Sequence, residues 1–270
     1  MAQTFKTLSV EQKDRFEADG YLVVKGVFDP LEVEEIRETF QKIGNTTIPG
    51  YFEPELSGAT EGVDPLKRYP RVMHPHRFNP IAKKYMLHPT VLAIMNDLYG
   101  EEALAAQSMF YYKPPGSRGQ ALHQDNFYLK VEPGNCIAAW TAIDRCDEEN
   151  GCMLLVPKTN VYDIVCPDES DAKESFTTHY VKPPKDEKPV AAVMEPGDVL
   201  FFNGNLIHGS YRNKSKDRFR RAFICHYANI STTRISKHYN PLYRADGTAL
   251  ELEGNPDGGP CGIETPAYYH

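Results

Sequence analysis

The stretch Glu195-Pro-Gly-Asp-Val-Leu-Phe-Phe-Asn-Gly-Asn-Leu-Ile-His-Gly-Ser210 carries the clearest indication of the fold. Pro196-Gly-Asp198 is turn chemistry, and the apolar run Val199-Leu-Phe-Phe202 has the length of a buried strand. A second, shorter apolar segment, Leu206-Ile207, then leads to His208. From about residue 104 onward, short β-type runs alternate in this way with Pro, Gly, Asn and Asp. The pattern predicts a core built from many short strands.

Working outward from this stretch, we expect strands at Gln107 to Lys113, Phe127 to Val131, Ile137 to Asp144, Cys152 to Val156, Val190 to Met194, Val199 to Asn203 and Arg221 to Ala228. So many short strands favour a sandwich or a barrel. Toward the N-terminus, Asp29, Pro30 and Glu32 start a helix over 30–43. A shorter helix runs from Ser9 to Gly20, a strand covers 21–28, and a third helix covers 90–99. Helices followed by strands predict a mainly β, α+β fold in which the helices buttress a double-sheet core.

Length and composition set the remaining expectations. The 270 residues predict one domain over 1–270, with a helical and loop part at 1–100, a β core at about 104–228 and a C-terminal extension at 229–270. Residues 45–80, rich in Pro and Gly, are expected to form a long irregular connection. A formal charge of −7 argues against a nucleic-acid partner. No apolar run approaches the roughly 18 to 20 residues that a membrane span needs, so no membrane association is expected.

The N-terminal sequence and the spacing of the cysteines indicate a cellular compartment. The N-terminus shows neither an export signal nor a transit signal, which predicts a cytoplasmic protein. The six cysteines lie apart, without any C-x-x-C pair. That pattern favours reduced thiols that pack in the core over a zinc site or a disulfide framework.

Leu122-His-Gln-Asp125 is the first candidate for chemistry. On an extended strand, residues i and i+2 point to the same face, so His123 and Asp125 could offer an imidazole nitrogen and a carboxylate oxygen to one ion. If His208 projects beside them, two His and one Asp form the facial triad of non-haem Fe(II) oxygenases. A zinc hydrolase can use the same ligands, and a barrel can also bury a histidine as a hydrogen-bonded core residue.

An inward-facing arginine would complete such a site. Alternation from residue 220 sets Arg220 and His226 on one face of the strand and Arg221 on the other. A buried guanidinium must meet an anion, which makes a dicarboxylate cosubstrate the attractive candidate for Arg220. The alternative is that Arg218, Arg220 and Arg221 are solvated charges at a strand end. His226 is expected to be a hydrogen-bonded core histidine rather than a fourth ligand.

These motifs together resemble the phytanoyl-CoA dioxygenase family of the Fe(II)/2-oxoglutarate oxygenase superfamily. The resemblance runs from Phe16 to about Tyr227. It rests on the blocks Gln107-Ser-Met-Phe-Tyr-Tyr-Lys-Pro-Pro-Gly116, His123-Gln-Asp125, Ala139-Trp-Thr-Ala-Ile-Asp144, Glu149-Asn-Gly-Cys152, Val156-Pro157, Pro196-Gly-Asp198, His208-Gly-Ser210 and Arg220-Arg-Ala222. It implies a double-stranded β-helix, the cupin-like jelly roll, flanked by N-terminal helices.

The resemblance also implies roles for individual residues. His123, Asp125 and His208 would ligate Fe(2+), and Arg220, assisted by Ser210, would bind the distal carboxylate of 2-oxoglutarate. Other residues are implied to line the cosubstrate pocket: Met109, Gln124, Trp140 and, at a position where the family often has lysine, Arg71. Met109 and Trp140 could instead be plain core residues and Ser210 a turn residue. An intact Asp125 favours hydroxylation, desaturation or cyclisation, because related halogenases lack this carboxylate.

The expected function is therefore a 2-oxoglutarate-dependent dioxygenase that uses O2, is stimulated by ascorbate and hydroxylates a small molecule. A polar metabolite or a specialised natural product is the first expectation for the substrate. An acyl-CoA thioester is the alternative, with Lys67, Arg68, Arg71 and Arg77 as a basic pocket rim. Two other readings stay open, namely a non-catalytic metal-binding module on the same fold and a metal-dependent hydrolase or isomerase on a similar barrel.

Overall fold

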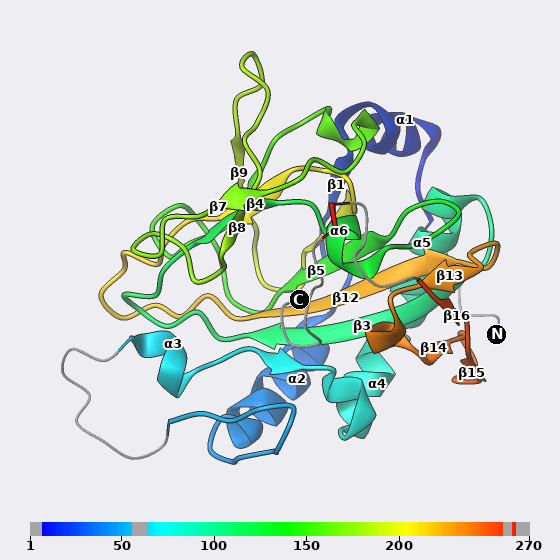
Figure 1. Cartoon of the computed structure of the whole chain (residues 1–270). Coiled ribbons are helices and arrows are strands. Elements are labelled where there is room, and N and C mark those ends of the chain that lie inside the picture. Colours follow the sequence, from blue (N-terminus) through cyan, green and yellow to red (C-terminus); the bar gives the residue numbers. More distant parts are fainter. Residues whose placement is uncertain (1–6, 56–63, 256–260, 263–270) are drawn as a thin grey trace.

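Two antiparallel sheets form the core of the protein (Figure 1). The computed structural model describes residues 7–55, 64–255 and 261–262. The larger sheet has the order β1-β10-β5-β12-β3-β14-β15, with β2 also paired to β3, and the smaller sheet has the order β4-β11-β6-β9. The strands of the larger sheet are β1 (Tyr21–Val24), β2 (Val72–Met73), β3 (Ala103–Tyr111), β5 (Ile137–Ala142), β10 (Val199–Asn203), β12 (Ala222–Asn229), β14 (Leu242–Tyr243) and β15 (Ala249–Leu250). The smaller sheet is built from β4 (Gln120–His123), β6 (Met153–Leu155), β9 (Val190–Ala192) and β11 (His208–Ser210).

The inner faces of the two sheets pack against each other. Met109, Trp140 and Ile224 from the larger sheet share one buried cluster with Met153 and Leu155 from the smaller sheet. Alternation along β12 has the predicted sense, because Phe223 and Cys225 belong to a different cluster on the opposite face of the sheet. This is the double-sheet core that the strand pattern predicts.

Helices cover the outer face of the larger sheet, and in Figure 1 α2 and α4 lie below β3. They are α1 (Val10–Asp19), α2 (Pro30–Ile43), α4 (Pro80–Met86) and α5 (Pro89–Tyr99). The predicted helix over 30–43 is confirmed, with Asp29 and Glu32 forming the capping box. Its apolar side enters the core, where the Phe40 ring stacks on Phe110 with centroids 4.0 Å apart. Three-to-four spacing of apolar residues therefore gives the helix one buried side.

Some strand predictions are wrong. Residues 127–131 do not form a strand, because Asn126–Leu129 is a short helix, α6, whose Phe127, Tyr128 and Leu129 are all buried. A short apolar run buried on all sides has no period that separates a helix from a strand. β4 was not expected, and β1 ends at Val24 rather than at residue 28.

The connection over 45–80 is partly structured. Residues 56–63 lie outside the described residues, and the rest contains α3 (Pro65–Arg68), β2 and the 3-10 turn η1 (Pro75–Arg77). Because Val72 and Met73 pair with Phe110 and Met109, this connection adds a short strand to the larger sheet beside β3.

The C-terminal extension packs against the end of the larger sheet. Beyond β12 it contains β13 (Arg234–Ile235), η3 (Lys237–Tyr239), β14, β15 and β16 (Glu253–Gly254). Within 158–190 lie η2 (Thr159–Val161) and the hairpin of β7 (Asp168–Glu169) and β8 (His179–Tyr180). A disulfide joins Cys166 in this segment to Cys261.

This disulfide corrects the expectation of six reduced thiols. The other four cysteines, Cys136, Cys146, Cys152 and Cys225, are free and buried, as a packing role requires. Cys166 and Cys261 are 95 residues apart, so only the tertiary fold brings them together.

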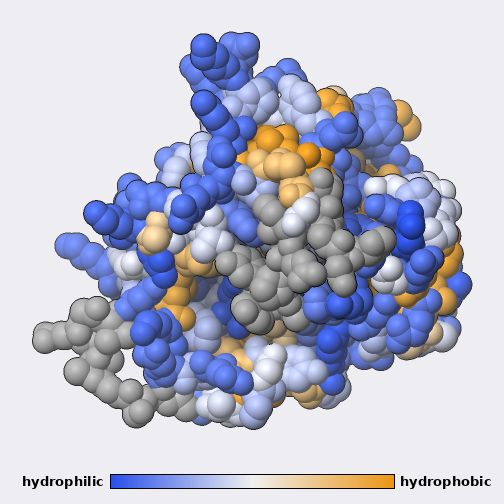
Figure 2. All heavy atoms as spheres, in the orientation of Figure 1, coloured by the Kyte–Doolittle hydropathy of each residue, from blue (hydrophilic) through white to orange (hydrophobic). Residues whose placement is uncertain are grey.

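The exposed surface is predominantly hydrophilic on the face drawn in Figure 2, where apolar colour gathers in small separate patches. The exposed large apolar side chains of the described residues are Val10, Leu31, Val161, Tyr162, Val165, Val190 and Val193. Scattered apolar side chains of this kind are normal on a protein surface. Within the described part of the chain, no helix has both the length and the apolar character of a membrane span.

Candidate active site

Two histidines and one aspartate meet between the sheets. His123 ends β4, His208 begins β11, and their Cα atoms are direct partners across the β4–β11 pair. One ligand atom from each of His123, Asp125 and His208 lies within 4.8 Å of the others. The Nε2 atoms of both histidines are 3.4 Å from Oδ1 of Asp125. All three side chains are at most 4% exposed, so the cluster is sealed from bulk water in this conformation.

Hydrogen bonds set the orientation of both imidazoles. Nδ1 of His123 donates to the carbonyl of Ala121 at 2.8 Å, and Nδ1 of His208 donates to the carbonyl of Leu206 at 2.9 Å. Because a carbonyl can only accept, each ring carries its proton on Nδ1 and a lone pair on Nε2. Burial lowers the pKa of His123, and the neighbouring His208 adds to the effect. A neutral imidazole with an inward lone pair is the form that binds a metal.

The route by which Asp125 reaches the cluster differs from the sequence argument. β4 ends at His123, and Asp125 stands at the start of α6 with helical torsions, φ −65° and ψ −37°. The two residues therefore do not share a face of one strand. A strand-to-helix turn brings the carboxylate back toward the imidazoles, and the i, i+2 rule predicted the proximity for the wrong geometric reason.

Arg220 is buried in the inner layer, with 1% of its surface exposed. Its Nε donates to the carbonyl of Gly151 at 3.0 Å, and its guanidinium carbon lies 5.1 Å from the centre of the Trp140 ring. Among the described residues, its Nη1 has no hydrogen-bond partner. Burial lowers the pKa of Arg220 to about 10. A buried guanidinium that lacks a partner on one nitrogen is a site prepared for an anion.

Lys113 adds a second buried cation, which the sequence analysis missed. The residue is 3% exposed, and its Nζ donates to Oγ of Ser210 at 2.9 Å. Burial, together with the positive charge of Arg220, holds the pKa of Lys113 well below its usual value. Lys113 lies two residues after the end of β3 and is followed by two prolines, and no local pattern in the sequence reports that its side chain is buried.

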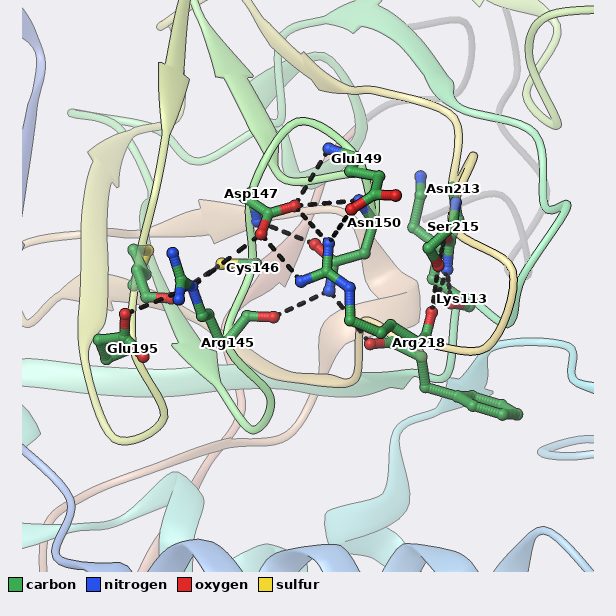
Figure 3. Close-up of polar contacts among 12 residues, drawn as sticks. Lys113, Arg145, Cys146, Asp147, Glu149, Asn150, Glu195, Asn213, Ser215 and Arg218 are labelled. Carbon is green, nitrogen blue, oxygen red and sulfur yellow. Dashed lines mark hydrogen bonds and ion pairs between the residues drawn. The ribbon is translucent and has the colours of Figure 1, made fainter.

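The other arginines of the cluster at 218–221 have acidic partners outside the inner layer. Arg218 makes two hydrogen bonds to Asp147 and one to Glu149, as Figure 3 shows, and Arg221 makes two side-chain bonds to Asp144. Of the three, Arg220 alone lies in the inner layer, which separates the two readings that the sequence left open.

A polar network holds the two loops that carry Arg220 and its partner Gly151 (Figure 3). Nδ2 of the buried Asn150 donates to the carbonyls of Arg145 and Phe219. Nδ2 of the buried Asn213 donates to the carbonyls of Lys113 and Arg218. The backbone of Arg220 also donates to the carbonyl of Lys113 at 3.1 Å. The loops before β6 and β12 are thus tied to each other and to the end of β3.

The remaining predicted pocket residues divide into three groups. Met109 and Trp140 line a small cavity together with the three clustered residues and His226. Arg71 lines a larger cavity of about 270 Å³ that Lys113 and Arg220 also line, and its guanidinium lies 5.3 Å from the Phe176 ring centre. Gln124 lines neither cavity. Its amide donates to the carbonyls of Asp163 and Asn205 and accepts from the backbone of Val165, so it anchors the segment after η2.

His226 is hydrogen-bonded, as predicted, and its partner is Asp125. Its Nε2 lies 2.9 Å from Oδ2 of Asp125, and both side chains are 1% exposed. This contact joins the middle of the larger sheet to the cluster of His123, Asp125 and His208.

The chain is similar in sequence to phytanoyl-CoA dioxygenases of animals. Rat peroxisomal phytanoyl-CoA dioxygenase is 30% identical over 242 residues, which cover 85% of this chain and 71% of the rat protein. A probable phytanoyl-CoA dioxygenase of Caenorhabditis elegans is 29% identical over 247 residues, which cover 84% of this chain and 77% of that protein.

Solved structures share the fold. The epimerase SnoN in complex with Fe3+, alpha ketoglutarate and nogalamycin RO has a TM-score of 0.66 at 21% identity, and the match covers 83% of this chain and 84% of that one. EctD from S. alaskensis with 2-oxoglutarate and 5-hydroxyectoine has a TM-score of 0.65 at 19% identity, covering 92% of this chain and 86% of that one. The predicted mainly β, jelly-roll class is confirmed. The family model of phytanoyl-CoA dioxygenase (PhyH) matches residues 16–222, and the chain belongs to that family.

Proposed function

We propose that this protein is an Fe(II)- and 2-oxoglutarate-dependent dioxygenase that hydroxylates an unactivated C–H bond of a small molecule and releases succinate and CO2. The observation that carries the proposal is the buried cluster of His123, Asp125 and His208 in a cavity whose Trp140 also contacts Arg220, a buried arginine whose Nη1 has no hydrogen-bond partner among the described residues. Family membership supports the class of enzyme. A polar metabolite or a specialised natural product is the proposed kind of substrate, because SnoN and EctD are named with ligands of these kinds.

The donor set fits ferrous iron. His123 and His208 would each provide Nε2, and Asp125 would provide Oδ1. Two imidazole nitrogens and one carboxylate oxygen are a donor set that suits Fe(II). The hydrogen bonds from Nδ1 of both imidazoles hold the rings in place when metal is bound.

The cations fit the cosubstrate. Arg220 would bind the distal carboxylate of 2-oxoglutarate through the guanidinium edge that has no protein partner among the described residues, and Ser210 and Lys113 would bind it from the side. Met109 and Trp140 would form walls of the pocket. Arg71 would act at its outer end, and Gln124 would act indirectly by holding the segment that follows η2. An incoming dianion would neutralise the buried charge of Arg220 and would favour the protonated form of Lys113, whose pKa burial lowers.

When bound, iron and 2-oxoglutarate would supply the oxidising power, with one oxygen atom of O2 passing to succinate as CO2 is released and the other passing to the C–H bond of the substrate. The chain's own residues bind and orient these partners and exclude water from a buried site. Because Asp125 supplies a carboxylate at the position that halogenases leave vacant, hydroxylation is the proposed outcome.

Succinate release tests the class. The purified protein with Fe(II), ascorbate and 2-oxoglutarate should release succinate, and pooled metabolites that contain the substrate should increase the release and give a product heavier by one oxygen atom. A chelator should stop the reaction, and Fe(II) rather than Zn(II) should restore it. Activity with zinc in the absence of oxygen would instead show a hydrolase, and binding of 2-oxoglutarate without any succinate would show a non-catalytic module.

Acyl-CoA thioesters belong in the same screen as the second candidate. Lys67, Arg71 and Arg118 line the cavity of about 270 Å³ together with Lys113 and Arg220, which could favour an anionic substrate. Two members of the expected basic rim lie elsewhere: Arg68 donates to the carbonyl of Gly44, and Arg77 donates to the carbonyls of His238 and Asn240. A cytoplasmic location is part of the proposal, although the rat relative is named as peroxisomal. Cell fractionation decides between them.

A further inference from the structure

The two oxygens of the Asp125 carboxylate have different surroundings. Oδ1 lies 3.4 Å from Nε2 of His123 and 3.4 Å from Nε2 of His208. Oδ2 lies on the other side, 2.9 Å from Nε2 of His226. One oxygen therefore faces the metal-binding nitrogens, and the other is held by a residue of the larger sheet.

The backbone around Asp125 would favour a different orientation. Asp125 is the N-cap residue of α6, a position where an aspartate ordinarily turns its carboxylate to accept from the backbone N–H groups of the first helical turn. Here the side chain makes no such capping bond. Instead, Oδ2 of the carboxylate accepts a hydrogen bond from Nε2 of His226. This contact directs the carboxylate into the cavity rather than toward the backbone of the helix.

His226 is itself held firmly. It lies near the middle of β12 and faces Gln107 of β3 and Ala138 of β5 as direct Cα partners. The β12–β3 pairing shifts register immediately after His226, because Tyr227 faces Ala105 and Ala106 is passed over. Such a bulge re-aims a neighbouring side chain and is common beside active sites. The ring is 1% exposed, and the small side chain of Ala138 leaves it room.

We propose that His226 is a positioning residue that makes Asp125 a one-oxygen ligand. With Oδ2 engaged by His226, Asp125 can offer only Oδ1 to the ion, and three coordination positions of an octahedral centre stay open. If both oxygens bound, two positions would remain, which is too few for 2-oxoglutarate as a chelate together with O2. The inference rests on the proposed function, since it assigns a task within that same site.

The test compares three variants of purified protein. His226→Leu removes the donor but keeps an apolar side chain of similar size, and His226→Gln keeps an N–H at about the reach of Nε2. His76→Leu is the matched control, because His76 is also buried, at 4% exposure, and its ring bonds Ser108 rather than a residue of the cluster.

Binding is measured without turnover. The single tryptophan, Trp140, lines the same cavity as the cluster and lies beside Arg220, so its fluorescence should report Fe(II) and 2-oxoglutarate under anaerobic conditions. The visible charge-transfer absorbance of the Fe(II)–2-oxoglutarate complex gives a second readout, and thermal unfolding of the metal-free proteins gives a third.

His226→Leu should weaken Fe(II) binding about 10- to 100-fold, the usual effect of removing a partner of a metal ligand, and should weaken or shift the charge-transfer band. His226→Gln should restore most of both. His76→Leu should change the unfolding temperature and leave both binding readouts at their wild-type values. If His226→Leu does not fold, His226→Asn, whose amide is too short to reach Oδ2, replaces it in the comparison with His226→Gln.

Wild-type Fe(II) affinity and an unchanged band in the donor-less variant would overturn the inference while leaving the proposed function intact. Equal losses in His226→Gln and the donor-less variant would also overturn it, because any disturbance of the strand would then have the same effect. A wild-type protein that binds Fe(II) but not 2-oxoglutarate would refute the proposed function, and the Fe(II) titrations alone would still decide the role of His226. A wild-type protein that binds neither would overturn both.

Discussion

At the scale of single residues, the site combines donors whose protonation is set by their surroundings. Nδ1 of His123 and Nδ1 of His208 each donate a hydrogen bond to a backbone carbonyl, so that Nε2 of each ring is the nitrogen available to an ion. Burial disfavours the charged forms of Arg220 and Lys113 and lowers the pKa of both, and a bound anion would stabilise those charged forms. Local sequence patterns identified His123, Asp125, His208 and Arg220. Lys113 escaped notice because its importance depends on burial, which no local pattern reports.

Asp125→Ala should abolish hydroxylation, since it removes the anionic ligand from the predicted iron site. Product formation and iron content of the purified variant are the measurements. Asp144→Ala is the control, because Asp144 pairs with Arg221 outside the inner layer and should leave iron binding unchanged. Iron-dependent hydroxylation by the Asp125 variant would contradict the assignment.

Arg220→Ala should raise the concentration of 2-oxoglutarate needed for half-saturation by about 30-fold or more, because a buried charge-assisted contact to a carboxylate costs about 2–5 kcal/mol to lose. Saturation of Fe(II)-loaded protein is followed by the fluorescence of Trp140 and by succinate release. A saturation curve like that of wild type would remove Arg220 from cosubstrate binding.

At the scale of elements, helix prediction succeeded where the information was local. Caps and periodicity of α2 lie within fifteen residues of each other, and the observed bounds match the predicted ones. Residues 127–129 failed because their burial on every side comes from distant segments rather than from an alternating pattern. For the same reason β4 was absent from the list of expected strands. It pairs with β11 through His123 and His208, which are 85 residues apart in the sequence.

The loop before β6 gives a prediction at this scale. Gly151 has φ of +89°, and a Cβ on it would lie 2.5 Å from Cε of Lys113 and 2.8 Å from the carbonyl oxygen of Tyr211. Gly151→Ala should therefore displace the loop and the carbonyl that holds Nε of Arg220, and raise the half-saturating 2-oxoglutarate concentration about tenfold. Gly247→Ala, at a similar φ of +84° but far from this loop, is the control for backbone strain. Equal effects of the two substitutions on cosubstrate binding would contradict the prediction.

The pair of Asp147 and Arg218 predicts a pH dependence of stability. Hydrogen bonds from Arg218 lower the pKa of Asp147 to about 2, below its ordinary value of 3.8. A depressed pKa in the folded state adds stability above the unfolded pKa, and this stability is lost as the pH falls from about 4 to about 2. Asp147→Asn should lower the free energy of unfolding by about 1 kcal/mol at pH 7, since the pair is partly exposed, and the difference should vanish only below about pH 2. Urea unfolding at several pH values measures it, and a pH-independent difference would contradict the prediction.

At the scale of the whole molecule, two facing sheets bring four distant segments into one cavity. β4 and β11 contribute the imidazoles, β5 contributes Trp140, and β12 contributes His226. The disulfide of Cys166 and Cys261 adds a covalent tie between the segment before β7 and the C-terminal extension. The expectation of reduced thiols failed here because a pairing across 95 residues leaves no trace in sequence spacing.

The disulfide predicts a redox-dependent stability. A cross-link across this separation restricts the unfolded chain, so Cys166→Ser should lower the free energy of unfolding by about 2–4 kcal/mol under oxidising conditions. Mass measurement after alkylation gives the number of free thiols, and denaturant unfolding with and without a reductant gives the energy. If the wild-type protein has six free thiols, the Cys166–Cys261 disulfide does not form in solution. That result would support a cytoplasmic location, because thiols stay reduced in that compartment.

The amino-acid sequence alone determined the strand-rich class, the capped helices and the identities of the metal-binding and arginine candidates, because turn chemistry, periodicity and ligand types are properties of short segments. Only the tertiary structure decided that Asp125 reaches the cluster from a helix start, that His226 holds its second oxygen, and that Lys113 lines the same cavity as Arg220. Each of these depends on which distant groups share a buried space, and burial is a property of the folded chain as a whole.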